Sequence, residues 1–412
     1  MSLFEERQKR INDSIALQEP DRVPITAYGQ CYPVINAGYT TADALYDFDV
    51  YAESMIKFLQ DYEPDCSGPA ITTAGQGPLM ELFQPKTIAW PGAPDARIDK
   101  NSIHQFIEFS VLQEEDMQFF MQDYTGWLLT KAYPAVSGLL EPFAGIDFAA
   151  HKLDTFPITF VSMLSTPAAK EMMQTIWKLG DMFAELGKKN MELGKKYAEL
   201  GFPSPIAARL LVPFDAYSDF HRGTLDAMMD LYEHPEVIQH FIDMHMEKVL
   251  QAIVRIGGMA PGKWLFMPLH KGMDSFLTDE QYKTYYWPYL QKMINKIIEV
   301  GMVPYVYTEG PYNSRIKYLA DVPKGKVVYH FEEADPVEVK KVLGDVACIS
   351  GFFPSYLLHY GTKQQCIDEA KRLIDILAPG GGYMLNATAA FDNAIPENIE
   401  AMFDTVKTYG AK

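Results

Sequence analysis

Hydrophobic and polar residues follow a regular rhythm from about residue 209 to the end of the chain. Short apolar runs alternate there with longer segments whose apolar residues recur at three- and four-residue steps. We predict strands at 209–215, 263–270, 302–310, 326–333, 347–353 and 382–388. Helices are predicted between and after them, at 224–257, 279–301, 313–322, 335–344, 363–379 and 395–410. This alternation predicts a parallel sheet.

The first 208 residues have a different pattern. Roughly the first 150 are rich in glycine, proline and aromatic residues, with short strands and ordered loops around one helix at 43–62. A longer helical pattern covers 162–201. We predict one domain over 1–412, with an N-terminal helix within 1–20, an elaborated first half at 21–208 and regular βα units at 209–412.

The fold class predicted by these patterns is α/β, a (β/α)8 TIM barrel with an elaborated N-terminal region. The unbroken repetition favours a closed barrel over an open sheet. No GxGxxG follows a strand, and the run Gly380–Gly382 precedes one, so we interpret it as a turn rather than a phosphate-binding loop.

Composition and charge narrow the function classes. The 412 residues are 48% hydrophobic and carry a net charge of −18, which disfavours nucleic acid and anionic membrane surfaces as partners. The four cysteines are scattered without a CxxC pair, which argues against a disulfide framework and a thiolate zinc finger. The charged first residues and the absence of about 18 consecutive apolar residues lead us to expect a cytoplasmic protein without a membrane span.

Residues at the carboxyl ends of the predicted strands are the candidates for chemistry, because parallel α/β folds place their sites there. Glu309 and His330 stand out, since they follow two successive strands. Each has a structural alternative: Glu309 would cap a helix near Asn313, and His270 would bond a loop carbonyl. For Arg222 we favour a salt bridge over substrate binding. The other strand-end candidates are Asp215, Tyr307, Glu332, Phe353, Asn386 and Thr388.

Several of these segments resemble the uroporphyrinogen decarboxylase superfamily, and within it the cobamide-dependent methyltransferases. The opening 6–26, with its PDRVP, looks like the superfamily's first helix running into a strand. Similar elements follow in the same order at 221–238, 276–310, 349–374 and 381–407. The resemblance covers most of the chain and is strongest from about residue 209. It implies a TIM barrel and enzymatic activity.

Departures from the family's patterns exclude two of its activities. Decarboxylases carry arginines near the start that bind substrate carboxylates, whereas 23–33 reads VPITAYGQCYP here. Thiol-directed methyltransferases carry zinc on an HxCG motif and a later cysteine. This chain has Tyr307-Thr308-Glu309-Gly310 at the first position, and the later cysteine falls near Thr388. Neither porphyrinogen decarboxylation nor thiol methylation is therefore expected.

The remaining branch transfers a methyl group from an O-methyl compound to cob(I)alamin held by a partner corrinoid protein. The departing oxygen needs a proton or a Lewis acid. The resemblance implies Glu309 as that acid, or Glu309 and His330 as ligands of a zinc ion with an unidentified third group. Tyr307 or His270 would share the proton.

A methoxylated aromatic is the expected methyl donor, since aromatic residues are frequent in the loops. The predicted substrate-binding residues are His270, Tyr312, Asn386, Phe353 and Trp90. Two other functions stay open at this point: a lyase acting on a small carboxylated substrate, and a corrinoid-binding accessory protein without activity. The oligomeric state, including a homodimer, also stays open.

Overall fold

The computed structural model describes residues 1–27, 29–68, 71, 73–95, 97–146, 161–162 and 164–411. Its centre is a sheet of six parallel strands that are neighbours in chain order. The six strands are β3 (Ile206–Arg209), β4 (Trp264–Leu269), β5 (Val303–Pro311), β6 (Val328–Glu333), β7 (Cys348–Phe353) and β8 (Tyr383–Ala387).

Two short N-terminal segments close this sheet into a ring. Ile25 pairs in parallel with Leu385 of β8, and Thr26 pairs in parallel with Cys66. The backbone N–H of Ser67 then donates to the carbonyl of Pro203, just before β3, over 2.9 Å. Six strands and two bridging segments thus form the eight-membered ring of a TIM barrel. The predicted α/β barrel class is confirmed.

A buried carboxylate holds the closing segments together. Asp65 is fully buried and forms ion pairs with Arg10 and Arg22, at 2.5 and 2.8 Å. It also accepts the backbone N–H of Ile25 over 2.7 Å. The first helix, the first bridging segment and the second are therefore tied to one side chain. The PDRVP motif contributes Arg22 to this network.

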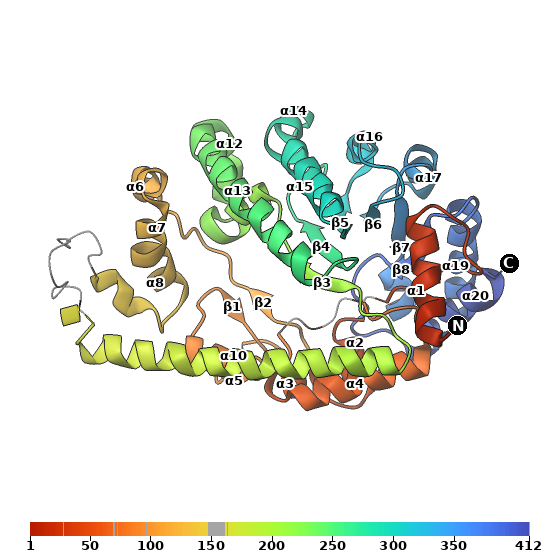
Figure 1. Cartoon of the computed structure of the whole chain (residues 1–412), viewed down its shortest axis with the longest axis horizontal. Helices are drawn as coiled ribbons and strands as arrows, with labels where there is room; N and C mark the ends of the chain where they lie inside the picture. Colours follow the sequence, from red (N-terminus) through yellow and green to blue (C-terminus); the bar gives the residue numbers. More distant parts are fainter. Residues whose placement is uncertain are drawn as a thin grey trace.

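Helices surround the sheet (Figure 1), and both chain termini lie at the same end of the molecule. The backbone N–H of Val23 donates to the carbonyl of Gly410, which ties the two ends together. The helices of this part are α1 (Leu3–Ile15), α11 (Pro213–Tyr217), η4 (Ser218–Arg222), α12 (Thr224–Glu233), α13 (Pro235–Met259), α14 (Asp279–Gln281), η5 (Tyr282–Tyr286), α15 (Trp287–Glu299), η6 (Asn313–Arg315), α16 (Ile316–Leu319), α17 (Pro336–Leu343), α18 (Ser355–Tyr360), α19 (Lys363–Leu377) and α20 (Pro396–Tyr409).

The N-terminal half adds short elements and one long helix, α10, which runs along one edge of the molecule (Figure 1). Thr166 caps the start of α10, with Pro167 at its first position. The elements of this half are α2 (Tyr32–Asn36), α3 (Thr41–Tyr46), α4 (Phe48–Tyr62), α5 (Gly77–Phe83), β1 (Ile88–Ala89), β2 (Gln105–Phe106), η1 (Glu114–Asp116), α6 (Met117–Gln122), α7 (Tyr124–Trp127), η2 (Leu128–Ala132), α8 (Tyr133–Val136), η3 (Glu141–Gly145) and α10 (Pro167–Glu199).

Three predicted elements differ from the structure. The helix at 43–62 is two helices, because Asp47 leaves the helical conformation and caps α4 by accepting the N–H of Asp49. The helix at 224–257 divides at His234, directly before Pro235, as residues preceding proline disfavour helical backbone. The strand at 209–215 was placed too late: β3 ends at Arg209, and Pro213 begins α11.

No helix within the described part of the chain is long and apolar enough to cross a membrane.

Candidate active site

A cavity of about 860 Å³ lies at the carboxyl ends of β3, β4 and β5; we call it the mouth cavity. Its barrel side includes Phe266, His270 and Glu309. The N-terminal half covers the other side with residues such as His104, and α10 contributes Leu193. The elaborated first half therefore encloses the end of the barrel where α/β barrels carry their sites.

Glu309 is the carboxylic acid of this cavity that lies near the C-terminal end of β5. Its side chain is 34% exposed, and burial raises its pKa to about 7. The negative charges of Glu332 and Asp215 raise the pKa further, while His270 and Arg209 oppose them. The structure shows no capping by Glu309 of the helix at Asn313, whose N-terminus has no side-chain hydrogen bond. Glu309 is thus able to exchange a proton near neutral pH.

His270 lies beside Glu309 at the end of β4. Its Nε2 is 3.8 Å from Oε2 of Glu309, and its Nδ1 is hydrogen-bonded to Asp219. Burial lowers the pKa of His270, but the hydrogen bond to Asp219 and the charges of Asp215 and Glu309 outweigh it and raise the pKa overall. Lys271 reaches the other oxygen of Asp219 at 3.3 Å. His270 is therefore oriented by Asp219 with Nε2 toward Glu309.

Asp215 fixes the backbone on which His270 stands. The fully buried carboxylate accepts the N–H groups of His270 and Lys271, over 3.1 and 2.9 Å. It also accepts the hydroxyl of Tyr286 over 2.7 Å. Burial raises its pKa to about 6, the charge of His270 lowers it and that of Asp219 raises it. Asp215 is a positioning residue, because its oxygens bond the backbone that carries His270.

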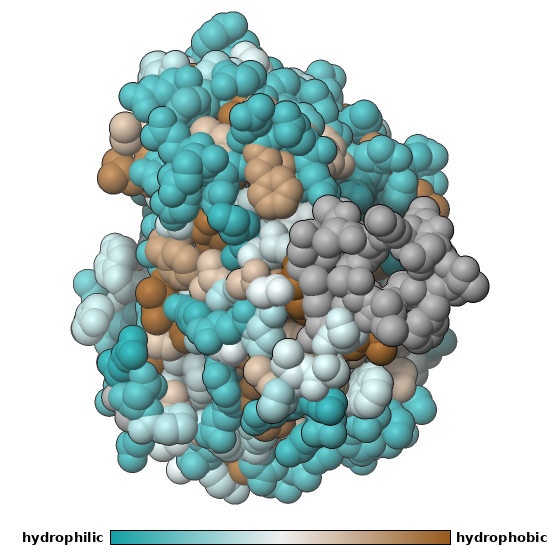
Figure 2. All heavy atoms as spheres, turned by 90° about the vertical axis from the view of Figure 1, so that its left-hand side faces the viewer, coloured by the Kyte–Doolittle hydropathy of each residue, from teal (hydrophilic) through white to brown (hydrophobic). Residues whose placement is uncertain are grey.

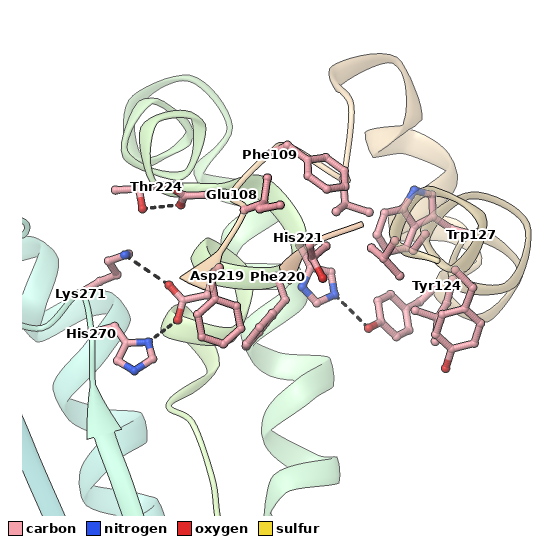
Figure 3. A pocket seen from close by; sticks show the side chains of 18 of the residues that line it. Glu108, Phe109, Tyr124, Trp127, Asp219, Phe220, His221, Thr224, His270 and Lys271 are labelled. Atoms are coloured by element: carbon pink, nitrogen blue, oxygen red, sulfur yellow. Dashed lines mark hydrogen bonds and ion pairs between the residues drawn. The ribbon is translucent and has the colours of Figure 1, made fainter. Parts of the chain in front are cut away.

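A second cavity of about 500 Å³ adjoins the first; we call it the aromatic cavity. It shares Phe106, Arg209, His270 and Lys271 with the mouth cavity. Figure 3 shows Asp219 between His270 and Lys271, with aromatic side chains of η4, α7 and the segment after β2 around it. These aromatic residues are Phe109, Tyr124, Trp127, Phe220 and His221.

His330 and Tyr307, two of the predicted catalytic residues, lie inside the barrel. His330 is 1% exposed, and its Nδ1 accepts the hydroxyl of Tyr305 over 2.7 Å. Its Nε2 donates to the carbonyl of Thr388, to which the Tyr307 hydroxyl also donates, at 3.3 and 3.0 Å. Burial lowers the pKa of His330 to about 4. Neither side chain lines the mouth cavity.

The predicted zinc site does not fit these residues. Both ring nitrogens of His330 are engaged in hydrogen bonds, which leaves no lone pair for a metal ion. Within the described residues, no group of three or more His, Cys, Asp and Glu is placed to hold a metal ion. The side chain of His330 points into the barrel and does not line the mouth cavity, which Glu309 lines.

Of the predicted substrate-binding residues, His270 alone among the five lines either cavity. Tyr312 and Phe353 are fully buried, and Asn386 is 1% exposed. Trp90 is buried and donates from Nε1 to the hydroxyl of Tyr46 over 3.3 Å, at a separate cavity beside α5. These four residues were predicted from their position at a strand end or from their aromatic side chain. Neither property indicates the direction in which a side chain points.

Two residues of the site were not among the sequence candidates. Asp219 lies one helical turn after Asp215, and this four-residue spacing was the available signal. Arg209 ends β3 and lines both cavities, but the late placement of that strand concealed its position. The interpretation of Arg222 is confirmed: it forms a buried salt bridge with Asp230 at 2.8 Å.

Comparisons with known proteins agree with the barrel. In structure, the whole chain matches the whole of a methyltransferase from Methanosarcina mazei, with a TM-score of 0.62 and 14% sequence identity. No curated protein matches the sequence. The uroporphyrinogen decarboxylase (URO-D) family model matches residues 196–409, which include β3 to β8 and the residues Asp215, Asp219, His270 and Glu309. The chain belongs to the uroporphyrinogen decarboxylase family.

Proposed function

We propose that this protein is a methyltransferase that moves a methyl group from an O-methyl compound to the corrinoid of a partner protein. The observation that carries the proposal is Glu309, a carboxylic acid with a pKa raised to about 7 at the mouth cavity, 3.8 Å from His270. An ether releases its methyl group only when the oxygen left behind is stabilised, and a proton donor serves this purpose.

Glu309 and His270 are placed to bind that oxygen together. The two side chains are too far apart for a direct hydrogen bond at 3.8 Å. An oxygen about 2.8 Å from each would accept from both, with Glu309 protonated and His270 in its doubly protonated form, which the hydrogen bond of Nδ1 to Asp219 favours. Protonated Glu309 gives its proton to the oxygen, and His270, oriented by Asp219, holds the oxygen in place.

The corrinoid supplies the nucleophilic cobalt that accepts the methyl group. The mouth cavity, at about 860 Å³, is the larger of the two cavities at His270. We propose that the partner corrinoid protein docks on the side of the molecule where this cavity lies. The structural likeness to a methyltransferase supports the reaction class. The missing arginines in 23–33 argue against binding of a porphyrinogen polycarboxylate.

The test is methyl transfer by Glu309→Gln. The enzyme, a reduced corrinoid protein and a panel of methoxylated aromatics, methanol and methylamines are mixed, and methyl-cobalt formation is followed by absorbance. We expect the variant to lose about 10²- to 10⁴-fold in rate, the usual contribution of a general acid. Glu338→Gln is the matched control, because Glu338 is on the surface and pairs with Lys341.

Each outcome has a defined meaning. Normal turnover by Glu309→Gln would remove the acid role from that residue. Turnover of a carboxylated compound without any corrinoid would establish a lyase in place of the methyltransferase. Corrinoid binding without turnover of any donor would establish an accessory protein.

A further inference from the structure

The aromatic cavity has no part in the proposal so far, although its chemistry is distinctive. Its volume of about 500 Å³ lies within the range of small-molecule sites. Phe109, Tyr124, Trp127, Phe220 and His221 provide most of its ring surface. Tyr124 is held by a 3.0 Å hydrogen bond to His221, which in turn stacks on Trp127. The inner wall is therefore formed by flat rings that contact one another.

The outer rim of this cavity exposes large apolar side chains. Phe106, Phe109 and Phe220 are 60%, 36% and 46% exposed. Figure 2 looks onto the side of the molecule that carries α6 to α8, and apolar residues run across the middle of that face. Neighbouring apolar side chains exposed at the rim of a cavity are typical of a binding site.

His270 connects this cavity to the proposed chemistry, because it lines both cavities. Asp219, the partner of Nδ1, lines the aromatic cavity, whereas Glu309, which faces Nε2, lines the mouth cavity. An ether oxygen that is hydrogen-bonded to Nε2 of His270 would thus lie at the boundary between the mouth cavity and the aromatic cavity. Its methyl group would point into the mouth cavity and its ring into the aromatic cavity.

Arg209 adds a charge requirement at the same boundary. Its guanidinium lies 3.5 Å from Nε2 of His270, and no carboxylate of the described residues forms an ion pair with it. The charge of Arg209 acts on Glu309 without an ion pair between the two side chains, so the guanidinium is available for an anionic ligand at the two cavities that it lines. A carboxylate is the planar anion that a guanidinium binds with two parallel hydrogen bonds.

We infer that the aromatic cavity binds the ring of the methyl donor and that Arg209 binds an acidic substituent on that ring, so the donor is a methoxylated aromatic carboxylate. This inference rests on the proposed function, since it assigns the ring to the molecule whose ether oxygen lies at His270. It goes beyond that function by naming the site and the charge of the donor.

Whether the aromatic cavity binds an aromatic ring is tested by measuring ligand binding in the absence of corrinoid. Calorimetry compares methoxybenzene with cyclohexyl methyl ether, which has similar bulk and no aromatic face. We expect tighter binding of methoxybenzene, and loss of about tenfold in its affinity in Phe220→Ala, because one ring contact contributes about that much. Tyr232→Ala is the control, an aromatic residue of α12 that is 75% exposed and lines neither cavity.

Whether Arg209 binds a carboxylate of the ligand is tested by measuring the binding of 4-methoxybenzoate to Arg209→Gln. Loss of a charge-assisted pair is expected to weaken binding of the benzoate by about 10- to 100-fold and to leave methoxybenzene unchanged. Thermal melting of each variant shows that the fold is intact. Equal losses for both ligands would remove the assigned role of Arg209.

The failure of this inference can be told apart from that of the proposed function. Transfer from methanol or a methylamine, with no preference for aromatic over saturated ligands, would overturn the inference and keep the methyltransferase. Tight, Phe220-dependent binding of methoxybenzoate with no methyl transfer to any corrinoid would overturn the methyltransferase and keep an aromatic acid site.

Discussion

At Glu309, the surroundings of one side chain determine which proton chemistry it can perform. An exposed glutamate is ionised at neutral pH and has no proton to give. Burial in the mouth cavity raises the pKa of Glu309 to about 7, so that a substantial part of the molecules carry the proton at that pH. His270 complements it, because Asp219 orients the ring and raises its pKa.

The rate of methyl transfer should therefore depend on pH in one direction. The protonated form of Glu309 is active, so kcat is expected to be constant below about pH 6 and to fall about tenfold per pH unit above pH 7. Rates are measured from pH 5.5 to 9 with the corrinoid kept reduced. Glu309→Gln should show a low rate without this decline. A rate that rises through pH 7 in the native enzyme would contradict a general acid at this position.

Asp215 should make stability decrease as pH rises. Its folded pKa of about 6 lies above the ordinary 3.8, so the folded state binds this proton more tightly than the unfolded state. The stabilisation is complete below pH 4 and is lost as pH rises through 6, by roughly 3 kcal/mol for a shift of about two units. Denaturant unfolding at pH 4, 5.5 and 7 measures the difference between the native chain and Asp215→Asn. A difference that does not change with pH would show that burial does not perturb this carboxyl group.

At the scale of elements, β7 requires a glycine in its middle. Gly351 has a φ of +88°, and a Cβ atom there would lie 2.4 Å from the carbonyl oxygen of Phe331 and 2.9 Å from the ring of His330. β6 therefore packs His330 directly over the backbone of β7. The absence of a side chain at residue 351 leaves the space that the His330 ring occupies.

Substitution Gly351→Ala should destabilise the protein by roughly 2–4 kcal/mol, since backbone strain and a steric clash act together. Gly262→Ala is the matched control: its φ is +75°, but its Cβ would meet no atom within 4 Å. The control should lose only about 1 kcal/mol, the cost of the conformation. Chemical unfolding measures both variants, and equal losses would show that the contact with β6 carries no energy.

Across the whole molecule, barrel closure depends on a few side chains rather than on long strands. In the part of the chain that the structure describes, the β-bridges of the two bridging segments involve Ile25, Thr26 and Cys66, and Ser67 adds one hydrogen bond to Pro203. Asp65, buried between Arg10 and Arg22, connects them to α1. So short a pairing of strands removes little apolar surface from water and contributes little stability by itself. The ion pairs of Asp65 are therefore needed to hold the two segments in place.

Asp65→Asn should therefore lower the free energy of unfolding by about 3 kcal/mol, the lower end of the usual effect of removing one partner of a buried pair, because Arg22 loses its carboxylate whereas Arg10 keeps its ion pair with Asp21. Asp13→Asn is the control, since the Lys9–Asp13 pair on α1, in which Lys9 is exposed and Asp13 half-buried, contributes about 0.5 kcal/mol. Thermal and denaturant unfolding measure both. A loss in Asp65→Asn no larger than in the control would show that closure does not depend on this network.

Local sequence determined most elements of the second half. Strands β4 to β8 are close to their predicted bounds, because each is a short apolar run between turn residues. α17 lies within its predicted range of 335–344, with Asp335 as its cap and Pro336 at its first position. The errors lie where one residue changes the local backbone, at Asp47, His234 and Pro213. The prediction of one domain over 1–412 stays a prediction.

The candidate site was only partly readable from the sequence. Glu309 and His270 were found because strand ends of a parallel barrel share one edge. His330 was chosen on the same ground, but it lies inside β6 rather than at its end, and the alternation of side chains along β6 places it against Tyr305 and β7. No local pattern gives that direction without the register between strands.

The sequence by itself therefore determined the class of the fold and the family, because apolar periodicity and the order of βα units are local properties of the chain. Only the tertiary structure decided which strand-end residues share a cavity. It placed Asp219 against His270, raised the pKa of Glu309 by burial and brought Phe109 and Trp127 from the first half to Phe220 of the second. Burial, register and contacts between distant segments exist only once the chain is folded.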